Sequence, residues 1–501
     1  MDRAVRHDSR RTLWWNSLVA GPVVVLAALA LLFASATAGS AQFMDEGEGS
    51  GAPPQPSHFV TRPDLTPPVV NVETPADGTA PGYVFLAPYG KGAQGGPLIV
   101  DDTGQPVWSQ PVGDGVGQFG MDFKAQQYQG KPVLTWWQGR PHPGFGSGEY
   151  VITNQSYKQI ATIRMGNNLQ ADLHELVITP RDTALVMAYN TVQLDRPVVE
   201  GVIQEIDIAS GRVLFEWHSL DHVGLDESNV PAPEGKPYDY VHLNSIQETA
   251  EGDLLVSARH TSALYLVDRE TGAVQWRLGG KRSDFQVAPD AAFAWQHDAR
   301  RQPDGTLTLF DNASDRPGPA SRALVLGVDQ QARKVSLVKA FPHPKGTTSV
   351  SQSSHQVLPG GNHFVGWGSQ ANFTEFDAEG NVVMHGEFGD GMPSYRAFRL
   401  PWVGAPSEPP VAALQPGADG APTVYASWNG ATEVRGWRVL AGPAADQLRP
   451  VADVARSGFE TAAALPAPEA FAAVEALDAG GNVIGRSAPV QAPAAVPAFA
   501  G

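Results

Sequence analysis

One stretch of the sequence decides the fold: Val267-Asp268-Arg269-Glu270-Thr271-Gly272-Ala273-Val274. An apolar residue and an aspartate precede a short turn that ends in glycine, and a second apolar strand follows. Copies of this phrase recur along the chain 48 to 61 residues apart, with Asp or Asn markers at Asp102, Asn154, Asp207, Asp268, Asp329 and Asp377. Each copy is typical of a β-hairpin. A hairpin repeated at about 50 residues indicates the blades of a β-propeller.

The six markers predict an all-β fold with a six-bladed β-propeller over residues 81–403. Glycine (53 residues) and proline (42 residues) are abundant, and charged residues make up only 17%, which favours many turns and short strands. A parallel α/β fold is disfavoured, because no segments of helical periodicity separate the strands.

The ends of the chain differ from this middle part. In residues 1–41 four arginines precede an apolar run from Leu13 to Ala38, and small residues follow. This pattern predicts a signal peptide or a membrane-anchor helix. We therefore expect an extracytoplasmic protein, secreted or anchored, that meets the membrane only through this segment.

Two further boundaries follow from composition. Residues 42–80 are rich in Gly, Pro, Glu and Thr and are expected to form a linker and a lead-in to the propeller. Residues 404–501 contain short alternating runs separated by turn clusters, which predict a β-sandwich of the fibronectin III or immunoglobulin type with a C-terminal tail.

Charge and cysteine content exclude several classes of function. The chain has 35 Lys+Arg against 52 Asp+Glu, a net charge of −17, so nucleic acid is not an expected partner. It has no cysteine, which excludes disulfides, thiolate metal sites and a cysteine nucleophile.

A second repeated element begins with a histidine and runs into a strand, a turn and another strand. The four copies start at His174, His242, His297 and His355. Because equivalent positions of propeller blades are related by rotation about the channel, we expect these histidines to converge there. Each one alone is better explained as a strand-end side chain, but four in register favour a site.

Imidazoles can act as nucleophile, general acid or base, or metal ligand. The spacing matches no compact metal motif, so we expect no metal and no other cofactor. Two alternatives stay open: a propeller lyase or hydrolase with a histidine-bound metal, and a non-catalytic propeller that binds a partner or ligand at the channel mouth.

An arginine follows the third histidine in the segment Phe310-Asp311-Asn312-Ala313-Ser314-Asp315-Arg316. The guanidinium of Arg316 offers a fixed fork of donors that suits sulfate or phosphate oxygens. An ion pair with Asp311 or Asp315 is an equally good reading. The sequence therefore suggests anion handling beside the histidines.

Several segments resemble the arylsulfotransferase family, in particular its actinobacterial and fungal subgroup. They are Phe59 to Pro68, Gly82-Tyr83-Val84-Phe85, Leu173-His174-Glu175, His242-Leu243-Asn244-Ser245, Trp295-Gln296-His297-Asp298, and Gly305 to Asn312. The resemblance covers about Phe59 to Trp402. It implies a six-bladed propeller that moves a sulfuryl group from an aryl sulfate to a phenol. A transient sulfo-histidine carries the group in a ping-pong cycle, without a nucleotide sulfate donor.

The resemblance also implies roles for individual residues. His355 matches the nucleophile, while His242 and His297 match histidines that contact the sulfuryl group, and Arg316 matches the arginine of the family's loop. Further residues are expected to bind substrate: His174, His260, Asn244, Asn312 and Trp295. The expected partners are a small aryl sulfate and a phenol.

Overall fold

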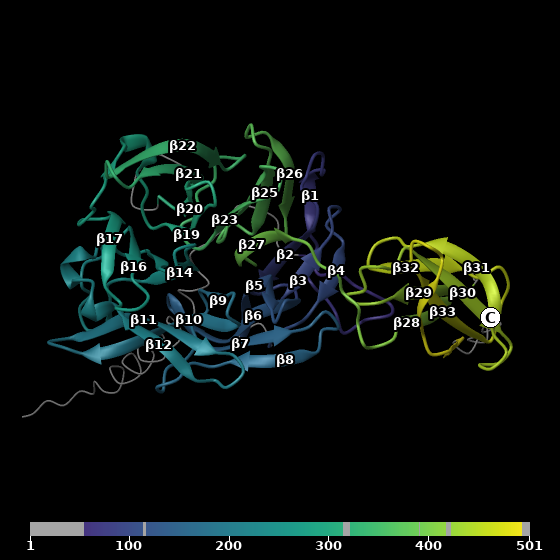
Figure 1. Ribbon diagram of the computed structural model, residues 1–501. Helices are drawn as coiled ribbons and strands as arrows, with labels where there is room; N and C mark the ends of the chain where they lie inside the picture. The colour runs from purple at the N-terminus through teal and green to yellow at the C-terminus, as the bar shows by residue number, and fades with distance from the viewer. Residues whose placement is uncertain (1–54, 114–116, 314–320, 390, 417–421, 493–501) are drawn as a thin grey trace, which may run out of the picture.

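The computed structural model describes residues 55–113, 117–313, 321–389, 391–416 and 422–492 (Figure 1). These ranges form strands β1–β35 and three short 3-10 helices, and they contain no α-helix. The 3-10 helices are η1 (Ser219–Asp221), η2 (Leu225–Glu227) and η3 (Pro289–Ala291). Within the described ranges no helix is long and apolar enough to span a bilayer. The apolar segment predicted at residues 1–41 lies outside them, as does Arg316.

Six sheets lie between Asn71 and Leu400 and surround a common axis in a propeller-like way (Figure 1). Neighbouring strands are antiparallel except at the short strands β13 and β18. Sheet 1 holds β27 (Ser394–Leu400), β2 (Tyr83–Pro88), β3 (Leu98–Val100) and β4 (Pro106–Ser109). Sheet 2 holds β5 (Phe119–Tyr128), β6 (Lys131–His142), β7 (Phe145–Thr153) and β8 (Gln159–Ile163). Sheet 3 holds β9 (Leu176–Ile178), β10 (Thr183–Gln193), β11 (Pro197–Asp207) and β12 (Val213–His218), with β13 (Tyr238–Asp239) beside β11.

The other three sheets repeat this arrangement. Sheet 4 holds β14 (Leu243–Glu248), β15 (Leu254–Ala258), β16 (Ala263–Val267) and β17 (Val274–Gly279). Sheet 5 holds β19 (His297–Arg301), β20 (Leu307–Asp311), β21 (Arg322–Asp329), β22 (Lys334–Pro342) and β18 (Gln286–Val287). Sheet 6 holds β23 (Ser354–Val357), β24 (His363–Gly366), β25 (Asn372–Phe376), β26 (Val382–Glu387) and β1 (Asn71–Thr74).

The two ends of this region cross over to each other's sheets. The late strand β27 pairs with β2 and so supplies the first strand of sheet 1. The early strand β1 pairs with β26 and supplies the outer strand of sheet 6. The sheets therefore begin at Asn71, inside the segment predicted as linker and lead-in.

The hairpin phrase found in the sequence has one position in every sheet. It joins the third strand to the fourth: β3 to β4, β7 to β8, β11 to β12, β16 to β17, β21 to β22, and β25 to β26. The marker side chain caps the turn in five of the six copies, and in sheet 1 the residue before the marker, Asp101, does so. Asp268 Oδ1, for example, accepts the backbone N–H of Thr271 at 2.7 Å, and Asp207 Oδ1 accepts that of Ser210 at 2.8 Å. The repeat therefore follows from local turn chemistry.

Apolar cores hold neighbouring sheets together. Within the described ranges, one cluster of buried side chains lies between each adjacent pair, including sheets 6 and 1. Between sheets 5 and 6, for example, the rings of Phe310 and Trp367 meet edge to face at 5.4 Å. Burying one such large apolar side chain stabilises a protein by about 1.5–3 kcal/mol, so the ring of sheets has a continuous apolar support.

A separate pair of sheets follows Trp402. One holds β28 (Val411–Pro416), β29 (Pro422–Ser427) and β32 (Glu460–Ala464); the other holds β30 (Gly436–Gly442), β31 (Arg449–Ala455), β33 (Phe471–Leu477), β34 (Val483–Arg486) and β35 (Val490–Gln491). Both sheets contribute to one buried cluster around Trp437. Thr61 connects this part to the lead-in, because its Oγ1 lies 2.7 Å from Ser427 Oγ and its N–H donates to Glu460.

Candidate functional site

Four histidines line one cavity of about 430 Å³ near the axis: His174, His242, His260 and His297. Three were predicted to converge from the repeat, and His260 was predicted from the family resemblance. The rings of His174 and His242 are 5.1 Å apart, and those of His242 and His260 are 4.6 Å apart. The structure therefore brings together side chains that are far apart in the sequence.

The first strands of the sheets bring these histidines to the axis. His174 lies two residues before β9, His242 directly precedes β14, and His297 begins β19. His242 has φ +50°, an uncommon left-handed conformation for a non-glycine residue. His260 comes from the turn between β15 and β16, where its N–H donates to Val241 O at 3.1 Å.

Two aspartates fix the orientation of two imidazoles. Asp172 Oδ2 lies 2.5 Å from His174 Nδ1, and Asp239 Oδ2 lies 2.6 Å from His242 Nδ1. Because an ionised carboxylate only accepts hydrogen bonds, each Nδ1 must donate, and the lone pair of the neutral ring is then on Nε2. The sequence reasoning missed both aspartates, although each stands within three residues of its histidine.

Asn312 fixes the tautomer of His297. Its Nδ2 donates to Ser349 O at 2.8 Å, so its Oδ1 is the acceptor for His297 Nδ1 at 2.7 Å. The Nε2 of His297 accepts the N–H of Gln352 at 3.3 Å. Asn312, expected to bind substrate, therefore acts here by positioning a histidine.

The Nδ1 of His260 also donates to an acceptor, and the partners of this ring are a backbone carbonyl and an arginine. Its Nδ1 donates to the carbonyl oxygen of Asp239 at 2.7 Å, and its Nε2 accepts from Arg259 Nη1 at 3.1 Å. All four cavity histidines thus present Nδ1 to an acceptor, so a ring that is neutral has its lone pair on Nε2.

Burial keeps three of these rings neutral. Desolvation, followed by the charge of neighbouring groups such as His174 and Arg259, lowers the pKa of His242 well below its usual value. Desolvation and Arg259 do the same to the pKa of His297. The pKa of His260 is lowered to about 3, again mainly by burial. Neutral imidazoles of this kind can act as nucleophiles, bases or metal ligands.

Aromatic side chains surround the imidazoles. The Tyr189 ring lies 5.6 Å from His242 and stacks on Phe145, while Tyr395 lies 5.3 Å from His174. Trp295, predicted to contact substrate, meets His260 edge to face at 5.5 Å. These rings offer an apolar surface for an aryl group. Tyr189 has no signal in the sequence, because it comes from the second strand of sheet 3.

His355 does not join the other histidines, so the predicted convergence is wrong for this residue. It lines a different cavity of about 380 Å³, together with Lys124 and Arg300. Its Nε2 lies 2.9 Å from His363 Nδ1, and its Nδ1 lies 3.1 Å from Leu324 O. The side chain is 1% exposed and turns toward the space between sheets 5 and 6.

A ladder of hydrogen bonds between sheets gives the physical reason. Asp122 Oδ2 accepts the N–H of Leu176, Ser245 Oγ that of Ala299, Asp298 Oδ2 that of His355, and Ser354 Oγ that of Ala397. In each case a residue of one first strand accepts from the next first strand. In this register the counterpart of His297 in sheet 6 is Ser353, not His355. In sheet 4 the counterpart is Asn244, not His242.

Asn244 therefore lies on the axis but does not line the cavity. Its Nδ2 donates to Gln296 O at 2.7 Å, and its own carbonyl oxygen accepts from Arg396 Nη2 at 2.9 Å. The predicted substrate contact of Asn244 is replaced by this connection between sheets 4, 5 and 1.

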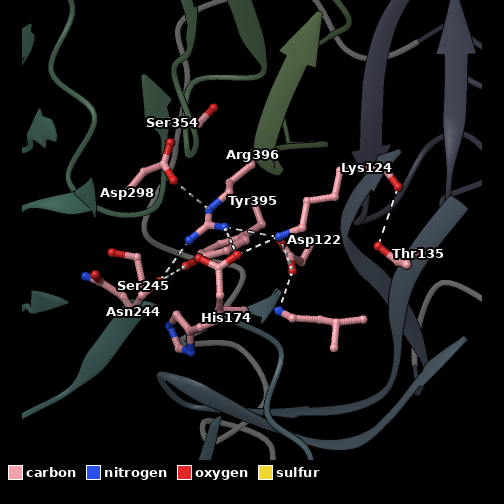
Figure 2. A network of polar contacts seen from close by, with 12 residues as sticks. Asp122, Lys124, Thr135, His174, Asn244, Ser245, Asp298, Ser354, Tyr395 and Arg396 are labelled. Atoms are coloured by element: carbon pink, nitrogen blue, oxygen red, sulfur yellow. Dashed lines mark hydrogen bonds and ion pairs between the residues drawn. The ribbon is translucent and has the colours of Figure 1, made fainter. Parts of the chain in front are cut away.

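A buried network of charges occupies the axis next to the cavity (Figure 2). Three carboxylates and three cations form it: Asp122, Glu175 and Asp298 with Lys124, Arg300 and Arg396. Arg396 Nη1 lies 2.9 Å from Glu175 Oε1 and 3.2 Å from Asp122 Oδ1. Burial raises the pKa of Glu175, but Arg300, Arg396 and Lys124 outweigh it and hold that pKa below the usual range.

The network separates the two cavities. Lys124, Asp298 and Arg300 line the cavity of His355, whereas the sequence neighbours of Glu175 and Arg396, which are His174 and Tyr395, line the histidine cavity. Figure 2 shows His174 and Tyr395 next to Arg396, with Asp298 on its other side. The sequence analysis did not predict this network.

One group in the cavity has the composition of a metal site. Asp239, His242 and His260 each offer a ligand atom, and these atoms lie within 4.8 Å of one another. Both histidines lie beside the Asp239 carboxylate, at 2.6 Å and 3.6 Å. Nitrogen and carboxylate donors of this kind suit Zn²⁺ and similar ions.

Comparison with solved structures finds remote likenesses. A protein of unknown function from Bacteroides caccae is 13% identical (TM-score 0.38; 64% of this chain and 100% of that chain covered). PorZ, a surface component of the type-IX secretion system of Porphyromonas gingivalis, is 10% identical (TM-score 0.40; 80% and 63% covered). Virginiamycin B lyase from Staphylococcus aureus is 10% identical (TM-score 0.25; 64% and 84% covered). At these scores the likenesses carry no conclusion about this chain.

Comparison with protein families gives a direct result. No curated protein matches the chain. The model of the arylsulfotransferase (ASST) family matches residues 124–389, more than half of the 501 residues, and this span includes all four cavity histidines. The chain belongs to the arylsulfotransferase family.

Proposed function

We propose that the protein transfers a sulfuryl group from an aryl sulfate to a phenol through a histidine of the cavity. The observation that carries this proposal is the set of four imidazoles around one cavity, each with Nδ1 bonded to an acceptor, so that a neutral ring has its lone pair on Nε2. A nucleophile of this kind needs no cofactor to accept the group.

His242 is the acceptor that the geometry favours. Its ring lies nearest the middle of the group, with His174, His260 and Tyr189 around it. Asp239 holds its Nδ1–H, which supports the positive charge that develops on the ring. Gly144 leaves space beside it, because a Cβ there would lie 3.2 Å from His242 Cε1.

The reaction then proceeds in two displacements. The lone pair of His242 Nε2 attacks sulfur, the bond from sulfur to the aryl oxygen breaks, and the phenolate leaves with that electron pair. His174, whose Nδ1–H is held by Asp172, acts here as the imidazolium: its Nε2–H gives its proton to this oxygen, and the ring becomes neutral. A second phenol then returns a proton to His174 Nε2 and attacks sulfur, which breaks the N–S bond and restores the lone pair of His242. General acid–base help of this kind contributes about 10²–10⁴-fold.

The test compares His242→Ala, His297→Ala and His355→Ala in the full chain, with 4-nitrophenyl sulfate as donor and phenol as acceptor. We expect phenol-dependent nitrophenol release in the wild type, loss in His242→Ala, and little change in His355→Ala. Loss in His355→Ala with retention in His242→Ala would return the nucleophile to the residue that the family resemblance indicates. No release from a folded wild type with several aryl sulfates would refute sulfuryl transfer.

A metal-dependent hydrolase or lyase is the second candidate, favoured by the group of Asp239, His242 and His260. One control distinguishes histidine-mediated transfer from a metal-dependent reaction. Prior incubation with EDTA leaves histidine-mediated transfer unchanged, whereas it abolishes a metal-dependent reaction that added Zn²⁺ or Mn²⁺ restores.

The proposal extends to the whole chain. The pairing of β27 with β2 and of β1 with β26 supports a closed six-bladed propeller that ends near residue 403, with residues 404–501 as an appended sandwich. The apolar segment in residues 1–41 supports export, with the chain secreted or anchored. Fractionation of cells that express the full chain, followed by N-terminal sequencing, tests both cleavage and location.

A further inference from the structure

Arg259 places a fixed positive charge on the wall of the histidine cavity. It belongs to the turn between β15 and β16 and lines the cavity beside His260. Its Nη2 donates to Val350 O at 3.2 Å, and its Nη1 lies 3.1 Å from His260 Nε2. The guanidinium also stacks over the Trp295 ring, with Cζ 4.7 Å from the ring centroid. These three contacts hold the side chain in one place.

The cavity needs such a charge if it accepts an anion. Burial keeps His242, His260 and His297 neutral, so these rings do not compensate a sulfate ester. The protein as a whole carries −17, and Asp239 adds a negative charge to the cavity wall. Of the described lining residues, Arg259 and the exposed Lys236 are the lysine or arginine side chains.

We propose that Arg259 binds the oxygens of the sulfuryl group and stabilises the charge that they carry during transfer. The inference rests on the proposed function for the transfer step, but the binding of an anion can be tested without turnover. A guanidinium suits sulfuryl oxygens because its donors form a planar fork. The charge of Arg259 also contributes to the lowered pKa of His242, His260 and His297, after burial as the main cause, so it acts across the whole cavity.

Calorimetric titration with inorganic sulfate tests the binding directly. The matched control is Arg333→Gln, because Arg333 also stacks on an aromatic ring, Phe285 at 5.0 Å, but does not line the cavity. We expect the wild type and Arg333→Gln to bind sulfate alike and Arg259→Gln to bind it about 10- to 100-fold more weakly. Equal affinity in Arg259→Gln, or no binding by the wild type up to the highest soluble concentration at constant ionic strength, would overturn the proposal.

Turnover gives a second readout that a purely structural role would not move. We expect Arg259→Gln to lower kcat/KM for 4-nitrophenyl sulfate by about 10²–10³-fold. Removing the charge also raises the pKa of the cavity histidines, so the acid limb of the pH profile moves to higher pH. Arg259→Lys, which keeps the charge without the fork, recovers part of the activity.

The two proposals fail separately. Sulfate binding that depends on Arg259, without sulfuryl transfer by the wild type, would support the anion site and refute the proposed function. Full transfer and an unchanged pH profile in Arg259→Gln would refute the role of Arg259 and leave the proposed function intact. Arg259→Lys decides the matter if thermal unfolding shows that Arg259→Gln does not fold.

Discussion

Two groups of buried histidines lie on either side of the charge network, and His242 in one differs from His355 in the other in how its ring nitrogens are bonded. His242 lines the cavity and uses Nδ1 to bond Asp239, while its Nε2 has no hydrogen-bond partner among the described residues. On the other side, His355 has both nitrogens in contact with protein groups, Leu324 O and His363. Burial alone does not separate the two groups, because it lowers the pKa of His355 to about 3, as it does for His260.

The comparison teaches that a low pKa marks a buried imidazole, not a reactive one. What distinguishes His242 is a carboxylate behind one nitrogen and space in front of the other. His355 instead packs against Phe341 and His363 as part of the core between sheets 5 and 6. Reactivity should therefore follow the direction of the Nε2 lone pair.

The largest expected effect is the contrast between His242→Ala and His355→Ala. If His242 is the acceptor, its loss removes the covalent route, and kcat falls by about 10⁴-fold or more, as for other nucleophiles. His355→Ala leaves kcat within about 10-fold and acts on stability, by about 2–4 kcal/mol for a large-to-small change in a packed site. Steady-state kinetics and urea unfolding of both variants measure the contrast. Equal loss of kcat in both would remove the distinction between the two groups.

Breaking the network between the two groups has the next largest effect. Arg396→Met leaves the buried carboxylates of Glu175 and Asp122 without one of their partners, and such a loss costs about 3–5 kcal/mol of unfolding free energy. The control is Arg438→Met, which removes an exposed ion pair with Asp453 and is expected to cost less than about 1 kcal/mol. Guanidinium unfolding of the full chain compares them. A cost for Arg396→Met no larger than that of the control would mean that the network does not stabilise the axis.

The third largest effect is expected from changing Asp239 or Asp172, the carboxylates that bond Nδ1 of His242 and His174. In Asp239→Asn the amide can donate to His242 Nδ1, which moves the proton to Nε2 and removes the lone pair from the cavity. We expect kcat to fall by about 10³–10⁴-fold, because a triad aspartate behaves in this way. Asp172→Asn acts on the proton-donating His174 and is expected to cost about 10²-fold. A larger loss in Asp172→Asn than in Asp239→Asn would exchange the roles of the two histidines.

The sequence predicted the fold far better than the register of the site. The turn aspartates, such as Asp207 and Asp268, act locally, so their spacing reports the sheets directly. The order of residues in the first strands does not report the register of the site in this direct way. The pairing of these strands is irregular between Leu243 and Ser245 and between His297 and Arg300. Reading from histidine to histidine therefore shifted His355 by two residues.

The rest of the site could not be read from the sequence, for a different reason. Tyr189 comes from the second strand of sheet 3, and only the packing of sheets 3 and 4 brings it to His242. Arg259 follows the second strand of sheet 4 and reaches the cavity through the pairing of β14 with β15. The charge network joins Asp122 to Arg396, residues from sheets 2 and 1 that meet only when the ring of sheets forms. Asp172 and Asp239 could have been predicted from the sequence, because an aspartate two or three residues before a histidine can bond back to its ring.

The smallest expected effect is the pH dependence, and it sharpens the comparison because both groups contribute. Burial and neighbouring charge lower the pKa of His242 and His297, so the nucleophile stays neutral well below the ordinary value of 6.5. We expect kcat/KM for the donor to stay flat from about pH 7.5 to about pH 5. An apparent pKa near 6.5 in that profile would place the reacting histidine in water and contradict the cavity assignment.

The stability of the fold, unlike the activity, is expected to change with pH in the same range. His260 and His355 have folded-state pKa values of about 3, against 6.5 in the unfolded chain. Above pH 6.5 both states are neutral and neither histidine affects stability. As the pH falls from 6.5 toward 3, the unfolded chain binds protons that the folded chain does not, so each such histidine lowers stability by about 1.4 kcal/mol per pH unit. His355→Phe removes one of these groups without a cavity, so its melting temperature should fall less steeply between pH 6 and pH 4.5 than that of the wild type. An unchanged slope would show that His355 binds its proton over the same pH range in the folded and unfolded chain, which would contradict its burial as a neutral ring.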